Sequence, residues 1–141
     1  MLKGQVGMMY FVRIREGEDL AEAIKERVEE TGIKAGIFLA IGSLKEAVLG
    51  YLKNGQYKSV ELDGPLEIAS CMGNVAVDEK GEVIIHAHLV VSNEDGEAFG
   101  GHLMKGSHVG ATAELIIIEG VGVKLQKVLD EKTKLRLWKL G

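Results

Sequence analysis

The sequence predicts one α/β domain that is dominated by an antiparallel β-sheet and flanked by one or two helices. Two observations predict this class: many apolar runs separated by turn residues, and one strongly amphipathic stretch. Short turns join most of the apolar runs, which favours antiparallel pairing of the strands. The chain has 141 residues, 46% of them hydrophobic and 27% charged, so we expect a single domain over residues 1–141.

The first two expected elements are a strand and a helix. Residues 5–14 alternate in hydrophobicity and are followed by the turn sequence Glu16-Gly17. Asp19 is a suitable helix cap, and Glu22, three residues later, completes a capping box. We expect the helix to end at Thr31-Gly32. Its apolar stripe consists of Leu20, Ala23, Ile24 and Val28.

The remaining chain is predicted to be a succession of strands. Asn54-Gly55 is typical of a hairpin turn, and we expect Asp63-Gly64-Pro65 to interrupt the chain before the next strand. An alternative for residues 35–44 is a second, buried helix, because a continuous apolar run is compatible with either structure. The expected strands are 35–44, 47–52, 57–62, 66–77, 82–92, 97–102, 112–119, 121–129 and 135–140.

Apolar side chains occupy both faces of the predicted sheet. In the strand 112–119, Leu115 and Ile117 point to one side, whereas Ile116 and Ile118 point to the other. Only one strongly amphipathic helix is available to cover either face. Because exposed apolar area of this extent is usually buried against another chain, we expect a homo-oligomer.

Charge and composition exclude several classes of protein. The net charge of −4 disfavours a domain that holds duplex DNA by itself, because such domains neutralise phosphates with a basic face. Cys71 is the single cysteine, which excludes an internal disulfide and favours a reducing compartment. No apolar run reaches the roughly 18 residues of a membrane span, and no signal-peptide pattern is present. We therefore expect a soluble, cytoplasmic protein with no membrane partner.

All four histidines fall in one short segment, between positions 86 and 108. His86 and His88 are two residues apart on a predicted strand, so their side chains project from the same face. His102 follows Gly100 and Gly101, where missing side chains allow a backbone or a ligand to approach closely. Two histidines at this spacing and a third farther along are typical of zinc sites that keep a fourth position open.

We therefore expect His86, His88 and His102 to bind a metal ion, with zinc as the candidate, or a small ligand. His108 is either a fourth ligand or a group that orients one of the other three. The alternative is that these strand histidines are ordinary polar side chains, satisfied by hydrogen bonds or by solvent.

Glu67 and Cys71 carry the other reactive groups that we consider. Glu67 lies between Leu66 and Ile68 in an apolar strand. It is either an outward-facing strand residue or a partner for a histidine, able to act as a base toward metal-bound water. The sequence places no base beside Cys71, so we interpret that residue as a small buried hydrophobe.

Several segments match, in the same order, the hallmarks of one known family. They are Gly42-Ser43-Leu44, Ala47-Val48-Leu49-Gly50-Tyr51, Gly64-Pro65-Leu66-Glu67-Ile68, His86-Ala87-His88-Leu89, Gly100-Gly101-His102-Leu103 and residues 109–119. Over nearly its whole length the chain resembles the plant and prokaryote conserved (PPC) domain. Plant members have Gly-Arg-Phe-Glu-Ile in the segment with Glu67. Here the basic-aromatic pair is replaced by Pro65 and Leu66, which disfavours plant-type partner binding through this segment.

The resemblance implies an α/β fold dominated by an antiparallel sheet and assembled as a homotrimer. Some prokaryotic relatives carry a metal near the shared histidines, which correspond here to His86, His88 and His102. Plant members bind AT-rich DNA through a separate AT-hook, Arg-Gly-Arg-Pro. This sequence has no such element, since its one proline is Pro65. Prokaryotic relatives are stand-alone domains without an established biochemical role.

Three functions are compatible with these observations. The first is a homotrimeric domain that binds a metal ion or a small ligand at the histidine cluster. If such a site were enzymatic, it would hydrolyse its substrate with metal-activated water, and Glu67 or His108 would move the proton. The second is a DNA-associated or regulatory protein, by analogy with the plant relatives, with DNA or a regulatory protein as its partner. The third is an interaction module whose histidines are ordinary polar residues.

Overall fold

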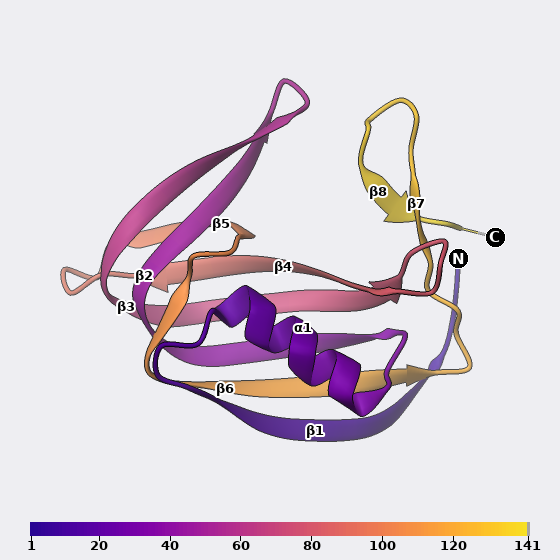
Figure 1. Cartoon of the computed structure of the whole chain (residues 1–141), viewed down its shortest axis with the longest axis horizontal. Coiled ribbons are helices and arrows are strands. Elements are labelled where there is room, and N and C mark those ends of the chain that lie inside the picture. Colours follow the sequence, from indigo (N-terminus) through magenta and orange to yellow (C-terminus); the bar gives the residue numbers. More distant parts are fainter. Residues whose placement is uncertain (141) are drawn as a thin grey trace.

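The structure, a computed structural model that describes residues 1–140, contains a twisted sheet, one helix and a short C-terminal hairpin (Figure 1). The elements follow in the order β1 (Gln5–Arg15), α1 (Leu20–Thr31), β2 (Gly36–Lys53), β3 (Gln56–Val77), β4 (Val83–Ser92), β5 (Ala98–Leu103), β6 (His108–Val121), β7 (Lys127–Leu129) and β8 (Arg136–Trp138). The strands of the main sheet lie in the order β1-β6-β2-β3-β4-β5, and all neighbours are antiparallel. The predicted fold class is therefore confirmed.

Strand β5 pairs with two partners and closes part of the sheet on itself. It lies beside β4, and it also pairs with β2, where Leu103 lies opposite Leu49 and His102 lies opposite Gly50. Strands β2, β3, β4 and β5 thus form a closed ring, and β6 and β1 extend the sheet from β2. This closure holds His102 between two strands rather than on a free edge.

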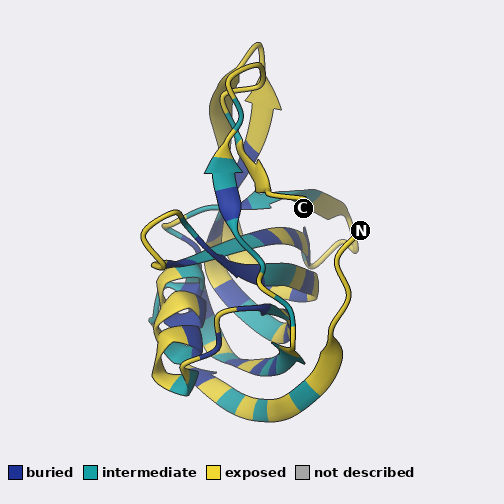
Figure 2. Ribbon diagram, turned by 90° about the vertical axis from the view of Figure 1, so that its right-hand side faces the viewer, coloured by how far each residue is buried: buried dark blue, intermediate teal, exposed yellow. Residues whose placement is uncertain are grey.

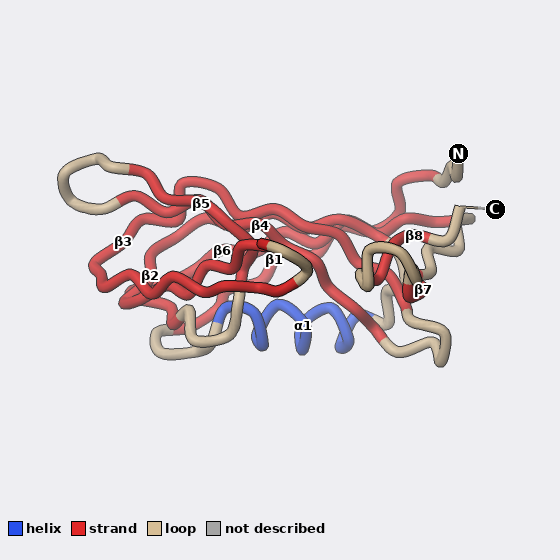
Figure 3. The backbone as a smooth tube through the Cα atoms, turned by 90° about the horizontal axis from the view of Figure 1, so that it is seen from above, coloured by secondary structure: helices blue, strands red, loops and turns tan. Residues whose placement is uncertain are grey.

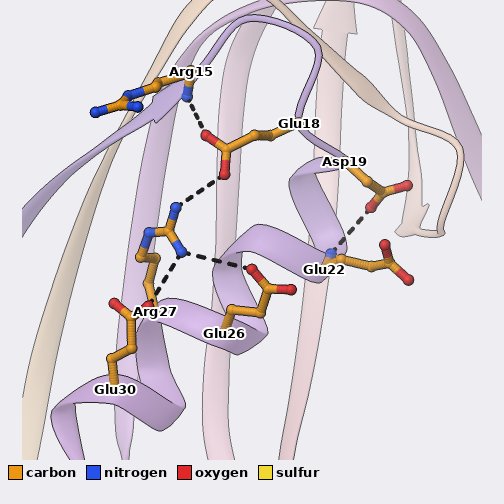
Figure 4. Close-up of polar contacts among 7 residues, drawn as sticks. All are labelled: Arg15, Glu18, Asp19, Glu22, Glu26, Arg27 and Glu30. Carbon is orange, nitrogen blue, oxygen red and sulfur yellow. Dashed lines mark hydrogen bonds and ion pairs between the residues drawn. The ribbon is translucent and has the colours of Figure 1, made fainter.

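Helix α1 begins and ends where the local sequence predicts. The Asp19 carboxylate accepts a hydrogen bond from the backbone N–H of Glu22 at 3.0 Å, which caps the first turn (Figure 4). Gly32 ends the helix in the left-handed conformation, with a φ of 75°, which a residue without a side chain adopts readily. The Arg27 guanidinium lies 2.9 Å from the Glu18 carboxylate and joins the polar face of the helix to the preceding turn (Figure 4).

The helix covers only one face of the sheet (Figure 3). Its apolar stripe is buried against that face, as predicted. Full burial of one Val, Leu or Ile side chain stabilises a fold by roughly 1.5–3 kcal/mol, so this layer supplies much of the driving force for folding. The largest fully buried side chains are Phe38, Ile14, Leu20, Ile24, Leu44, Leu49, Leu89, Leu115, Ile117, Val28, Val75 and Val91.

The opposite face of the sheet carries apolar side chains that no described element covers, as the sequence predicts. Phe11 is 72% exposed and Met72 is 56% exposed. These two belong to one row across the sheet, because Phe11 lies opposite Ile116, Ile116 opposite Leu39, and Leu39 opposite Met72. A groove of about 610 Å³ follows this face and is lined by residues of β1, β2 and β6. We call this surface the uncovered apolar face; Figure 2 shows how exposed its edge strand β1 is.

The alternative of a second helix over residues 35–44 is wrong. Residues 36–44 belong to β2, which also continues through the expected break at 45–46, where its pairing shifts in register. Its apolar run does not alternate with polar residues because one side faces the core and the other side lies on the uncovered apolar face. Gly42, with a φ of 144°, occupies one of these irregular positions, where a Cβ would collide with the carbonyl oxygen of Thr112.

Two other expected boundaries are also wrong. Asp63-Gly64-Pro65 does not interrupt the chain, because β3 runs through it at a bulge, where a proline without an N–H is tolerated. The expected strand 121–129 is shortened to Lys127–Leu129, because Gly122 turns the chain with a φ of 71°.

Two hairpins project in the same direction from the body of the sheet (Figures 1 and 2). One is the arm formed by the far ends of β2 and β3 around the predicted turn at Asn54-Gly55, and the other is the β7–β8 hairpin. Within residues 1–140, no helix has both the length and the apolar character needed to cross a bilayer.

Candidate metal centre

Three histidines from two neighbouring strands meet on the face of the sheet that carries Met72. His86 and His88 of β4 alternate with the buried Ala87, as predicted, and His102 of β5 lies directly opposite His88. The ring centroids of His86 and His88 are 5.1 Å apart, as are those of His86 and His102. One ring nitrogen from each histidine lies within 4.8 Å of the other two, so the three can reach one ion. We call this cluster the histidine triad.

Partial burial favours the neutral form of two of these imidazoles, His86 and His102. Together, burial and, after it, the positive charges of Lys127, His102 and His88 lower the pKa of His86 to about 4. The pKa of His102 is also lowered, first by burial and then by the charges of His88 and Lys127. An imidazole binds a metal through its neutral form, so protons compete weakly for the ring nitrogens of His86 and His102 at neutral pH.

Two buried polar atoms at the triad have no hydrogen-bond partner within the described residues. They are the Nδ1 atom of His102 and the Oδ1 atom of Asn74, a residue that lies opposite His86 on β3. Buried polar atoms are seldom left without a partner, and such exceptions point to an ion, a water molecule or a ligand. The donor set of three imidazoles suits zinc, whose tetrahedral ligands lie about 3.3 Å from one another, and it leaves one position open. The residues present therefore fit a metal ion.

The glycines before His102 bring three strands close together. A Cβ on Gly101 would lie 3.0 Å from the carbonyl oxygen of Gly50, on β2, and 3.2 Å from a side-chain atom of Tyr51. A Cβ on Gly100 would meet only Val90, at 3.2 Å, and Leu89 at 3.5 Å. The Tyr51 hydroxyl donates a hydrogen bond to the Gly100 carbonyl at 2.5 Å and holds β5 in place. The sequence suggests that these glycines allow close approach of either a backbone or a ligand. The structure shows the first of these, the close approach of β2 to β5 at Gly101.

Residues 1–121 match the Plants and Prokaryotes Conserved (PCC) domain, also abbreviated PPC. This chain belongs to the PPC family. The match contains all three triad histidines and every strand of the main sheet.

Solved structures of PPC proteins are similar over nearly the full chain. The metal-containing protein AF0104 from Archaeoglobus fulgidus is 34% identical, with a TM-score of 0.90 and 99% of each chain covered. A PPC protein from Pyrococcus horikoshii is 36% identical, with a TM-score of 0.88, and 99% of this chain and 95% of that chain are covered. A candidate DNA-binding protein from Ralstonia eutropha JMP134 is 25% identical, with a TM-score of 0.82 and coverage of 94% and 91%.

Two curated relatives match this chain over a small part of their own length. The bifunctional protein GlmU from Synechococcus sp. (strain JA-3-3Ab) is 29% identical over 126 residues, which make up 89% of this chain. The same protein from Synechococcus sp. (strain JA-2-3B'a(2-13)) is 28% identical over 127 residues. This chain spans 19% of the length of each of these relatives.

Glu67 and His108 do not join the triad in this PPC domain. Glu67 is exposed and lies opposite Ser92, four residues along β4 from His88, which corresponds to roughly 13 Å of strand. The Nδ1 atom of His108 lies 2.6 Å from a carboxylate oxygen of Glu46, at the start of β6. Each is therefore held away from the triad by its own strand register. Cys71 is buried, as the sequence predicts, and this burial raises the pKa of its thiol to about 12.

Lys127 and Asn74 lie beside the triad, although no pattern in the sequence marks either of them. Lys127, on β7, is 6% exposed, although lysine is seldom buried. It lines a pocket of about 750 Å³ together with Asn74, His86 and His102. The sequence gives no sign that Lys127 is buried whereas the nearby Lys124 is exposed. The burial of Lys127 depends on how the C-terminal hairpin folds back onto the PPC sheet.

Proposed function

We propose that this protein is a metal-binding PPC domain in which the histidine triad holds one divalent ion, with zinc as the physiological candidate. The observation that carries the proposal is the approach of three ring nitrogens to within 4.8 Å of one another. Three imidazoles with an open fourth position are a common zinc environment. We further propose that all 141 residues act as one domain.

Three further observations support the metal proposal. The Nδ1 atom of His102 is buried without a hydrogen-bond partner in residues 1–140, and a metal ion would supply that partner. AF0104, which is 34% identical to this chain, is described as a metal-containing protein. The lowered pKa values of His86 and His102 agree with ligation by neutral imidazoles.

We also propose that the protein is a homotrimer in which copies cover one another's apolar faces. The support is the row of Phe11, Ile116, Leu39 and Met72, with the groove of about 610 Å³ beside it. A face of this kind is characteristic of an interface between chains. The trimeric state is the one implied by the resemblance to PPC proteins.

Hydrolysis and DNA binding are less well supported than metal or ligand binding. Neither Glu67 nor His108 lies in the triad, so neither of the two bases predicted from the sequence stands beside the metal position. The net charge of −4 opposes direct contact with a phosphate backbone. The Ralstonia eutropha relative supports a DNA-associated role only by analogy.

Metal analysis of tag-free protein tests the proposal. After incubation with zinc and removal of excess ion, mass spectrometry of the metal content is expected to give about one zinc per chain. The double variant His86→Ala/His88→Ala is expected to lose it, whereas His108→Ala, which removes a histidine outside the triad, retains it. Zinc retained by the double variant, or absent from the unaltered protein, would overturn the proposal.

A further inference from the structure

The pocket beside the histidine triad contains more positive than negative charge. It is lined by His86 and His102 from the triad and by three basic side chains, Lys127, Lys134 and Arg136. None of its lining residues is an aspartate or a glutamate. Two of the three basic groups form ion pairs with carboxylates that do not line the pocket. Lys134 pairs with Glu131 at 3.2 Å, and Arg136 pairs with Glu79 at 2.5 Å. A metal ion in the triad would add further positive charge.

Lys127 is the uncompensated cation in this pocket. It is 6% exposed, and no described residue accepts a hydrogen bond from its ammonium group or forms an ion pair with it. Burial of much of the side chain lowers its pKa, as expected for an ammonium group with reduced access to water and no acidic neighbour. A buried charge is costly unless it is paired, so a pocket built around such a lysine favours a negatively charged occupant.

The remaining walls of the pocket are apolar or aromatic. Tyr57 comes from the β2–β3 arm, and its ring centroid is 5.1 Å from that of His102. Trp138 and Leu137 come from the β7–β8 hairpin, which projects on the same side as the arm (Figure 1). An inorganic anion would leave these surfaces in contact with water. An organic anion with an apolar body would bury them at a gain of roughly 25 cal/mol per Å² of apolar surface.

We infer that this pocket binds a small organic carboxylate, whose charged group lies between the metal position of the triad and the Lys127 ammonium. Its apolar body would lie against Tyr57, Leu137 and Trp138. A carboxylate oxygen is a suitable fourth ligand for zinc, and a second oxygen can accept a hydrogen bond from a lysine. This inference rests on the proposed metal site, and it names the class of ligand that completes it.

Calorimetric titration of zinc-loaded protein with benzoate tests the inference, with benzamide as the neutral probe of the same shape and phosphate as the inorganic anion. Benzoate is expected to bind, and both benzamide and phosphate are expected to bind more weakly by about tenfold or more. Lys127→Met is expected to weaken benzoate binding by about thirtyfold or more, as truncation of one member of a buried charge pair does. Lys127→Arg, which keeps the charge, restores part of the affinity. Lys124→Met, the same change at an exposed lysine nearby, leaves it unchanged.

Four outcomes overturn the inference. They are no binding of benzoate to zinc-loaded protein, equal binding of benzoate and benzamide, tighter binding of phosphate than of benzoate, and unchanged benzoate affinity in a folded Lys127→Met variant. Comparing the three probes requires no variant, so it decides the question even if Lys127→Met fails to fold. The zinc content, measured on the same samples, separates the two proposals. Zinc-loaded protein that rejects benzoate overturns only the carboxylate inference, whereas protein that takes up no zinc overturns both.

Discussion

Met72 of β3 lies directly opposite His88 of β4, so an exposed apolar side chain and a triad histidine are cross-strand neighbours on one face. The row extends in both directions across the sheet. It consists of one residue from each of β1, β6, β2, β3, β4 and β5, which are, in that order, Phe11, Ile116, Leu39, Met72, His88 and His102. The uncovered apolar face therefore leads directly into the triad. A second copy of the chain that covered this face would border the metal site.

Leu39→Glu is expected to break self-association. The substitution places a charge in the centre of the uncovered apolar face, between Met72 and Ile116, where a subunit interface would have to desolvate it. Light scattering is expected to give about 46 kDa for the unaltered protein, three times the 15.2 kDa of one chain, and a smaller mass for the variant.

Leu129→Glu is the matched control, because Leu129 is 50% exposed on β7, away from this row. It should leave the mass unchanged. A monomeric unaltered protein, or a Leu39→Glu variant of unaltered mass and intact circular dichroism, would refute the assembly.

The metal-free protein is expected to lose stability as the pH falls below about 6.5, the ordinary pKa of histidine. In the folded chain the pKa of His86 is about 4, so between these two values the unfolded chain binds a proton that the folded chain excludes. Acid therefore favours unfolding, and the stability that depends on neutral His86 is fully present only above the unfolded pKa.

Urea denaturation at pH 7.5 and pH 5.0 measures this effect. His86→Asn, which removes the titrating group but keeps a polar side chain, should show a smaller loss of unfolding free energy between the two pH values. Equal losses in the two proteins would show that His86 is not responsible.

Gly101→Ala is expected to loosen the triad without touching any ligand. Its Cβ would lie 3.0 Å from the Gly50 carbonyl oxygen, so β5 would have to move away from β2 and carry His102 with it. Overpacking of this kind costs about 1–3 kcal/mol of unfolding free energy, and we expect weaker zinc binding in addition.

Gly100→Ala is the neighbouring control, because its Cβ would meet mainly a methyl group of Val90, at 3.2 Å. Zinc competition with a chelating dye compares the two variants. An affinity that falls equally in both, or in neither, would contradict the role given to Gly101.

Features encoded by a few adjacent residues could be predicted from the sequence. The ends of α1 follow from Asp19 and Gly32, because capping is a contact within one helical turn. The shared face of His86 and His88 follows from the alternation of side chains along a strand. Residues 35–44 were harder to assign. They lie in a central strand that is apolar on both sides, and such a strand has no period that separates it from a buried helix.

Glu67 shows where this local reasoning ends. Its position in an apolar strand near the histidines in sequence is compatible with a catalytic role, but pairing with Ser92 separates it from His88 by four residues of β4. A difference of a few residues in register decides whether two side chains touch, and register is a property of the assembled sheet.

Local sequence patterns predict the antiparallel class, the single capped helix, the two apolar faces and the pair of histidines on one strand, because each depends on periodicity or on neighbouring residues. Long-range packing brings His102 to that pair, keeps Glu67 and His108 away from it, and buries Lys127 beside the triad. These contacts join residues that are distant in sequence. They arise from the closure of β5 onto β2 and from the folding back of the C-terminal hairpin.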